Sequence, residues 1–232
     1  MAKIKSDAHL WLTETGEAAA PAIGITSITK AKPCILTCSA ALPAGVVVGD
    51  FVMISGTNEV LLNGKTFRIE ALDITTPAAP KVTLYGFDGT KLNAAVGVVP
   101  SGAQFFQKAG TLALLEVCLV NLVVAGVAPD SIQMDDMCGS STVLGSPKPP
   151  TFTYSGFVDA ESPGYRNLVQ ASLESPKQLR YMLADYTVGG GYIFGPVEIG
   201  EITITAQTAQ GLQFSGSGVY TSMPTYSWAL AA

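Results

Sequence analysis

Hydrophobic and polar residues alternate along much of this chain with a period of two, the pattern of strands that bury one face. The alternation is clearest at 51–54, 66–70 and 201–205, where β-branched and aromatic residues are frequent. Turn signals separate the runs, and Asn63-Gly64 is the strongest because both residues tolerate a positive φ. The pattern predicts a fold built mainly of β-strands.

One helix interrupts this pattern. Ser162 is a good N-cap, and Pro163 fits the first helical position, where a missing N–H costs nothing. Three residues are expected to form the apolar face of the helix: Leu168, Val169 and Leu173. Ser175-Pro176 is expected to end the helix, and the alternation over 178–186 favours a strand.

The second half of the chain predicts an ordered series of elements. In chain order we expect a strand starting at Leu114, the segment 129–136, a long Gly/Ser/Pro-rich loop over 138–150, a strand over 151–158, the helix, a hairpin around Gly189-Gly190-Gly191, a turn at Gly195-Pro196-Val197, and strands over 201–206 and 211–218.

The composition is hydrophobic and poor in charge. Of the 232 residues 48% are hydrophobic and 13% are charged, whereas an average domain has about 25% charged residues. Such a surface fits a protein that buries much of itself against its own copies. Glu116, Asn121 and Gly126 interrupt the longest apolar stretch, 111–128, so we expect a pair of buried strands and no membrane insertion. Because the first nine residues lack a secretory signal, we expect the protein in the cytosol where it is made.

Charge and pattern both change near residues 22 and 107. Residues 23–107 carry six basic and five acidic side chains, a net charge of +1, whereas the flanks carry seven basic and thirteen acidic ones, a net charge of −6. We therefore expect three segments: residues 1–22 as an N-terminal arm and the first part of a domain, residues 23–107 as an inserted β-module, and residues 108–232 as the remainder of the first domain.

This organisation resembles the major tail tube protein of long-tailed, non-contractile bacteriophages. The ordered elements of the flanks carry the resemblance, together with the closing segment Phe214-Ser215-Gly216-Ser217 and the later Met223-Pro224 turn. The strands over 25–88 resemble a module that recurs as an insertion in structural proteins of tailed phages. The resemblance implies a tail-tube-like β-sandwich or barrel with one flanking helix, interrupted by a small all-β inserted domain.

The resemblance also implies a function. Subunits are expected to join edge to edge into rings, expected to be hexamers, which stack into the phage tail tube and form the channel for genome delivery. The implied partners are other copies of the chain and the tape-measure, tail-tip and tail-terminator proteins, in a virion tail assembled in the host cytoplasm. The inserted module is expected to project outward. Candidate contacts between subunits or rings are Trp11, Asp136, Met137, Ser140, Leu144 and Pro147.

The acidic balance bears on how DNA passes through such a channel. Each phosphate contact adds affinity, so an acidic or neutral wall leaves DNA mobile and binds none of it specifically. Four acids are candidates to face the lumen: Asp159, Glu161, Glu198 and Glu201. The alternative is that these acids are ordinary solvated groups on the outer surface.

Catalytic and metal-binding patterns are poorly supported. His9 is the only histidine, so the usual general base is missing, and Asp135 and Asp136 would point to opposite faces of a strand. Gly189-Gly190-Gly191 lacks the lysine and the helix start of a phosphate loop, and Ser215-Gly216-Ser217-Gly218 is not a nucleophile elbow. We expect no enzyme and no cofactor.

The cysteines also lack the spacing of zinc ligands. We expect all four to be buried as small hydrophobic residues: Cys34, Cys38, Cys118 and Cys138.

A second hypothesis is a tail-tip or receptor-binding module, or an adhesin, that recognises host surface carbohydrate through the inserted module. Exposed aromatic residues clustered on one loop would favour this hypothesis. The two tryptophans, Trp11 and Trp228, lie instead near the ends of the sequence.

Overall fold

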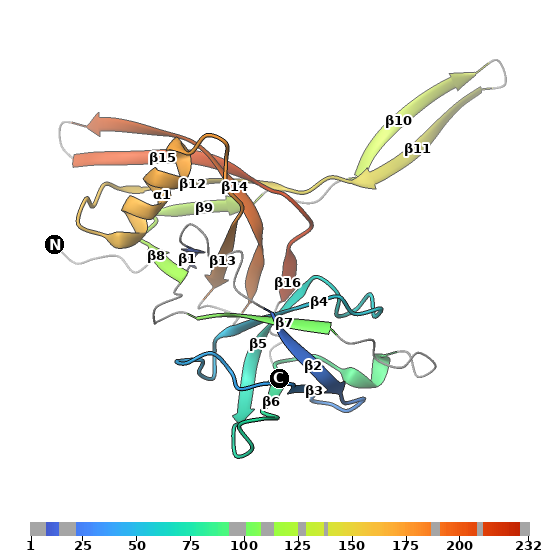
Figure 1. Ribbon diagram of the computed structural model, residues 1–232. Helices are drawn as coiled ribbons and strands as arrows, with labels where there is room; N and C mark the ends of the chain where they lie inside the picture. Colours follow the sequence, from blue (N-terminus) through green and yellow to red (C-terminus); the bar gives the residue numbers. More distant parts are fainter. Residues whose placement is uncertain are drawn as a thin grey trace.

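The computed structural model describes residues 8–13, 22–92, 101–107, 114–124, 129–136, 139–186, 191–207 and 211–227 (Figure 1). These residues form a mainly β structure with one α-helix, α1 (Pro163–Leu173), and one short 3-10 helix, η2 (Gly89–Lys91). The strands are β1 (Ala8–Thr13), β2 (Ile23–Ile28), β3 (Ile35–Cys38), β4 (Phe51–Ser55), β5 (Lys65–Asp73), β6 (Lys81–Leu84), β7 (Ser101–Phe106), β8 (Leu114–Val117), β9 (Asn121–Val124), β10 (Pro129–Asp136), β11 (Gly139–Pro147), β12 (Thr151–Phe157), β13 (Arg180–Tyr186), β14 (Tyr192–Gln207), β15 (Gly211–Tyr220) and β16 (Thr225–Ser227).

Strand β14 divides the large antiparallel sheet into two halves. The sheet has the order β8-β1-β13-β14-β15-β12-β9, and β16 also pairs with β14. Residues up to Val197 pair with β13, whereas residues from Val197 onward pair with β15, with a bulge between Ile199 and Ile202. We call β8, β1, β13, β16 and the first part of β14 the barrel-side half-sheet. The rest of β14 with β15, β12 and β9 is the open-edge half-sheet.

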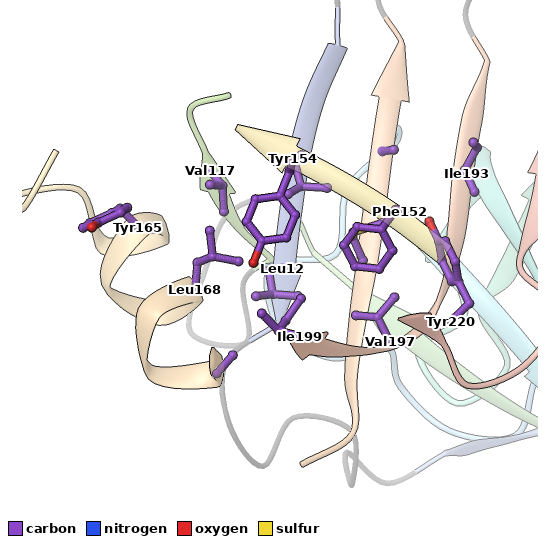
Figure 2. Close-up of a cluster of buried hydrophobic side chains, with 14 of the residues drawn as sticks. Leu12, Val117, Phe152, Tyr154, Tyr165, Leu168, Ile193, Val197, Ile199 and Tyr220 are labelled. Carbon is purple, nitrogen blue, oxygen red and sulfur yellow. The ribbon is translucent and has the colours of Figure 1, made fainter. Parts of the chain in front are cut away.

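The two half-sheets and α1 enclose the sandwich core (Figure 2). Met182 and Ala184 point into this core from β13, and Phe152 and Tyr154 point into it from β12. Leu168 of α1 is fully buried among these side chains. The alternation along each strand therefore gives each half-sheet one face in this core.

Small residues on β15 and β12 make room for aromatic rings in the sandwich core. Three directly paired cross-strand positions each combine an aromatic residue with a glycine: Phe152 with Gly218, Tyr154 with Gly216, and Phe214 with Gly156. A Cβ atom at any of these glycines would collide with the ring opposite it. The glycines in Ser215-Gly216-Ser217-Gly218 are therefore explained by packing.

Strands β2 to β7 form a closed antiparallel barrel in the order β2-β3-β6-β5-β4-β7. Its own core holds Leu36, Ile54 and Val82, which are fully buried. Strands β4 and β5 pair as expected for a hairpin, but their connection spans 56–64 and is not a two-residue Asn-Gly turn. Gly64 has a φ of 70°, whereas Asn63 has no positive φ. The barrel packs against the face of the barrel-side half-sheet that points away from the sandwich core. The barrel and the open-edge half-sheet thus lie on opposite sides of the barrel-side half-sheet (Figure 1).

The expected helix is confirmed, with one correction. The Ser162 hydroxyl accepts a hydrogen bond from the Tyr165 N–H, and Pro163 begins the helix. Its buried face consists of Gly164, Tyr165, Asn167, Leu168 and Ala171. Leu173 was expected on the apolar face but is 77% exposed, because the helix ends at this residue and the side chain lies beyond the part of α1 that packs on the sheet.

Three other sequence expectations are wrong. The expected loop over 138–150 contains β11, which pairs with β10 in a two-stranded sheet. Both strands are edge strands, where a proline such as Pro147 is tolerated. Gly195-Pro196-Val197 lies inside β14, where Thr221 N–H donates to the Pro196 carbonyl. The stretch 111–128 contains two strands, β8 and β9, but these lie at opposite ends of the sheet.

The cysteine expectation holds for Cys34 and Cys38, which are buried, whereas Cys118 is exposed. Cys118 lies in the connection between β8 and β9, outside both strands. Cys138 and the turn residues Gly189 and Gly190 lie outside the described residues.

Candidate functional site

The face of the open-edge half-sheet opposite the sandwich core is polar at its centre, and we call it the polar face. Three apolar side chains are exposed on the same face, nearer its margins: Val123, Phe157 and Val219. Thr153 pairs with Ser217, and Ser155 and Thr203 each pair with Ser215, so hydroxyl groups lie side by side on three strands. A shallow, open hollow of about 440 Å³ lies on this half-sheet, lined by Asn121, Thr153, Tyr154, Ser155, Glu201, Thr203, Ser215, Gly216 and Ser217. The surface offers many hydrogen-bonding groups and little charge.

Two of the four acids that were candidates for the lumen lie on this half-sheet. Glu201 lines the hollow, at the bulge in β14. Glu198 is exposed and pairs with Val219. Asp159 and Glu161 lie instead in the turn between β12 and α1, where the Asp159 carboxylate accepts the Glu161 N–H. The structure therefore brings Glu198 and Glu201 to one half-sheet and leaves the other two acids at the start of the helix.

The open-edge half-sheet also has two edges without a partner strand among the described residues. Strand β9 ends the sheet on one side. On the other side, residues 202–207 of β14 pair only with β15. Unpaired N–H and C=O groups along an edge are a template for another strand.

Apolar side chains lie at both of these edges. Ile204 of β14 is 54% exposed and lies on the core side of the half-sheet, opposite Phe214. Leu122 and Val124 of β9 are partly buried and pack against the sandwich core. If the two edges met, Ile204 of one copy would lie beside Leu122 and Val124 of the next.

The expected contact residues lie in two places. The β10–β11 hairpin follows β9 and precedes β12 in the sequence, and it extends away from the body of the molecule (Figure 1). It contains four of the expected contact residues: Asp136, Ser140, Leu144 and Pro147. Trp11 instead packs within the subunit, beside the aromatic residues that contact the barrel. Met137 lies outside the described residues.

The described side chains that could take part in catalysis or metal binding do not cluster. Within the described ranges, no three His, Cys, Asp or Glu side chains are placed to hold a metal ion. His9 Nδ1 lies 2.5 Å from Glu116 Oε1, at the β1–β8 edge of the sheet. Burial raises the pKa of the Cys34 and Cys38 thiols to about 11, which disfavours the reactive thiolate. No helix in the part of the chain that the structure describes is long and apolar enough to cross a membrane.

Sequence reasoning missed the contact between barrel and sandwich. Phe51 of β4 and Phe106 of β7 point out of the barrel and are buried against β13 and β14. The available signal was an aromatic residue at an outward position of each strand. That signal does not identify the partner surface.

Comparisons with known proteins add a likeness of fold. No protein-family model and no curated protein matches the chain. A chain from the extended sheath–tube complex of an extracellular contractile injection system, PVC, has a TM-score of 0.40 and 8% identity, over 49% of this chain and 82% of its own. A chain from the virion of a native gene transfer agent has a TM-score of 0.38 and 10% identity, over 47% and 84%. A chain from the tail of an empty gene transfer agent particle, refined with C6 symmetry, has a TM-score of 0.37 and 11% identity, over 53% and 87%. Likenesses of this extent establish no function, and a functional proposal therefore depends on the open-edge half-sheet.

Proposed function

We propose that this chain is a structural subunit of a phage-type tail tube, in which copies of the open-edge half-sheet join into a closed channel wall. The observation that supports this most directly is the combination of one polar face and two unpartnered edges on the same half-sheet. A non-enzymatic role fits this surface, which offers hydroxyl groups and two acids.

The strand directions allow such a closure. The order β14, β15, β12 and β9 is antiparallel at each step, so β9 and β14 run in opposite directions. The β9 edge of one copy and the β14 edge of the next therefore pair as antiparallel strands, and an even number of strands per copy keeps the alternation around any ring. Closure removes both edges, which otherwise invite uncontrolled pairing.

The polar face suits a channel through which DNA moves. Its central side chains are Ser and Thr hydroxyls, with Glu201 beside them. Such a wall holds water, and the residues described as lining its hollow include no Lys or Arg that a polyanion could bind, so DNA passes without specific contacts. In this arrangement Glu198 and Glu201 face the lumen.

With the polar face toward the lumen, the positions of the barrel and of the β10–β11 hairpin in the tube follow. The barrel of β2 to β7, an inserted domain in this proposal, lies on the side of the sandwich away from the polar face and projects from the outside of the tube. The β10–β11 hairpin contacts the neighbouring ring. We propose hexameric rings that stack into the tail of a bacteriophage virion, assembled in the host cytoplasm with tape-measure, tail-tip and tail-terminator proteins.

Negative-stain electron microscopy of the purified full chain tests this proposal. We expect rings or hollow tubes with outward knobs as the concentration rises, or after tail-tip and tape-measure proteins are added. Monodisperse monomers or trimers under both conditions would contradict the proposal. That result would favour the tail-tip or receptor-binding hypothesis.

A further inference from the structure

An aromatic cluster joins the barrel to the sandwich. We call it the aromatic joint; its buried members are Phe51, Phe106, Leu114, Tyr181, Leu183, Tyr192 and Phe194. The Phe106 ring lies 4.9 Å from the Tyr181 ring and 4.8 Å from the Phe194 ring. The Phe51 ring meets the edge of Tyr192 at 5.0 Å. These separations are those of favourable aromatic pairs.

Polar contacts fix the joint in one orientation. Arg68 of the barrel donates to Asp185 of β13 at 2.8 Å, and its guanidinium lies over the rings of Phe51 and Tyr192. The Tyr192 hydroxyl donates to the Thr66 carbonyl. The Thr66 N–H donates to the Thr225 hydroxyl. Strand β5 is therefore hydrogen-bonded to three strands of the sandwich, which a loosely tethered domain would not show.

Without the barrel, the barrel-side half-sheet would expose a continuous aromatic face. Tyr181, Leu183, Tyr192 and Phe194 are all buried in the complete chain, and Asp185 is paired. An exposed patch of that kind promotes association with other proteins. Domains within one chain usually move relative to each other. This barrel, in contrast, shares a buried cluster of side chains with the sandwich.

We propose that the barrel is a built-in cover for the aromatic outer face of the sandwich, and that barrel and sandwich unfold as one cooperative unit. The barrel is then an integral part of the subunit and not a detachable decoration. By covering this face, it leaves self-association to the strand edges, and the open-edge half-sheet supplies two of them. Only this last consequence rests on the proposed tail-tube function.

Peptide-resolved hydrogen exchange of the full chain across a urea titration tests the cooperative unit. The unfolding midpoint is measured separately for peptides from β3 and β6 and for peptides from α1 and β12. We expect the two midpoints to coincide in the unchanged chain. Leu36→Ala removes a fully buried side chain from the barrel core only, and we expect it to lower both midpoints together by about 1 M urea.

Two further variants complete the design. Ile54→Val is the milder variant, to be used if Leu36→Ala fails to fold. It removes one methyl group from the barrel core, and we expect it to lower both midpoints by about 0.3 M urea. Val60→Ala changes a side chain that is 83% exposed on the barrel and should move neither midpoint. Separate midpoints in the unchanged chain, or a shift confined to barrel peptides in either core variant, would overturn the proposal. Neither outcome depends on whether the chain forms tubes.

Discussion

The ring of Tyr154 lies directly over Gly216 on the neighbouring strand, so that a Cβ atom at Gly216 would come within 2.5 Å of the Tyr154 hydroxyl oxygen. The glycine removes the side chain that would otherwise separate this ring from β15. The ring in turn covers the backbone that the glycine leaves bare. The same arrangement at Gly218 and Phe152 lets the Phe152 ring lie directly against the backbone of β15.

Gly216→Ala is expected to destabilise the fold by about 1–3 kcal/mol, because the added methyl group must displace the Tyr154 ring in a packed core. Thermal unfolding followed by circular dichroism measures the loss. Ser217→Ala, at the adjacent position on the polar face, is the matched control and should change stability by less than about 0.5 kcal/mol. Equal effects of the two substitutions would contradict the packing argument.

Arg180→Met is expected to cost about 3–5 kcal/mol, because it leaves the groups around a buried charge without their partner. Arg180 is 1% exposed and donates to the Thr13 carbonyl, to Asn167 of α1 and to Glu174 beyond it. Urea unfolding measures the cost. The exposed Arg166, whose guanidinium contacts only the Glu161 carbonyl among the bonds described, provides the control Arg166→Met. Adding Glu174→Gln to Arg180→Met should recover part of the loss, and no recovery would argue against a buried ion pair.

Much of the fold follows from local sequence signals. The mainly β class, the capped start of α1 at Ser162 and a strand over 178–186 were all predicted and are confirmed, the strand as β13 (Arg180–Tyr186). Each depends on a pattern that is complete within about ten residues, such as a two-residue alternation or a cap followed by Pro163.

The features that sequence reasoning missed depend on partners far away in the chain. Gly195-Pro196 has the composition of a turn, yet β14 continues through it because β13 on one side and β16 and β15 on the other hold the backbone extended. Phe51 and Phe106 alternate like any strand residues, and only the folded chain shows that β13 and β14 cover them. The polar face was likewise invisible, because its hydroxyls come from three strands that are brought into register by the fold.

Alkaline pH is expected to destabilise the protein through its two buried thiols. Burial raises the pKa of Cys34 and Cys38 from 9.0 to about 11, so above pH 9 the unfolded chain loses protons that the folded chain keeps. Their contribution to stability is therefore complete below pH 9 and is lost as the pH rises through 11, by about 2 kcal/mol per thiol at pH 11. Urea midpoints measured from pH 7 to 11 should fall more gently in Cys38→Ala. The exposed Cys118 gives the control, since Cys118→Ala should leave the slope unchanged.

Ile204→Lys is expected to abolish assembly while preserving the fold. The Ile204 side chain is 54% exposed in the single chain, so a lysine is tolerated there. At the proposed interface between the β14 and β9 edges of two copies, the lysine would lie beside Leu122 and Val124. Sedimentation velocity and electron microscopy measure assembly, and thermal unfolding checks the fold. Ile74→Lys, at a position 63% exposed on the barrel, should assemble normally. Tubes formed by Ile204→Lys as readily as by the unchanged chain would rule out this edge as the interface.

Glu201→Lys is expected to make assembled tubes bind DNA. Glu201 lines the hollow on the polar face, so every ring would gain a circle of cations directed at the lumen. Each phosphate contact then adds affinity and a salt dependence of roughly −0.9 in the slope of log K against log salt concentration. Co-sedimentation of short duplex DNA with preformed tubes, over a series of salt concentrations, measures both quantities. Glu70→Lys makes the same change of charge on the exposed surface of the barrel and serves as the control. If the polar face lines the channel, only DNA bound by the Glu201→Lys tubes is protected from added nuclease, because the wall of the tube encloses it. Binding that is equal in the two variants, and equally open to nuclease, would place Glu201 on the outside of the assembly.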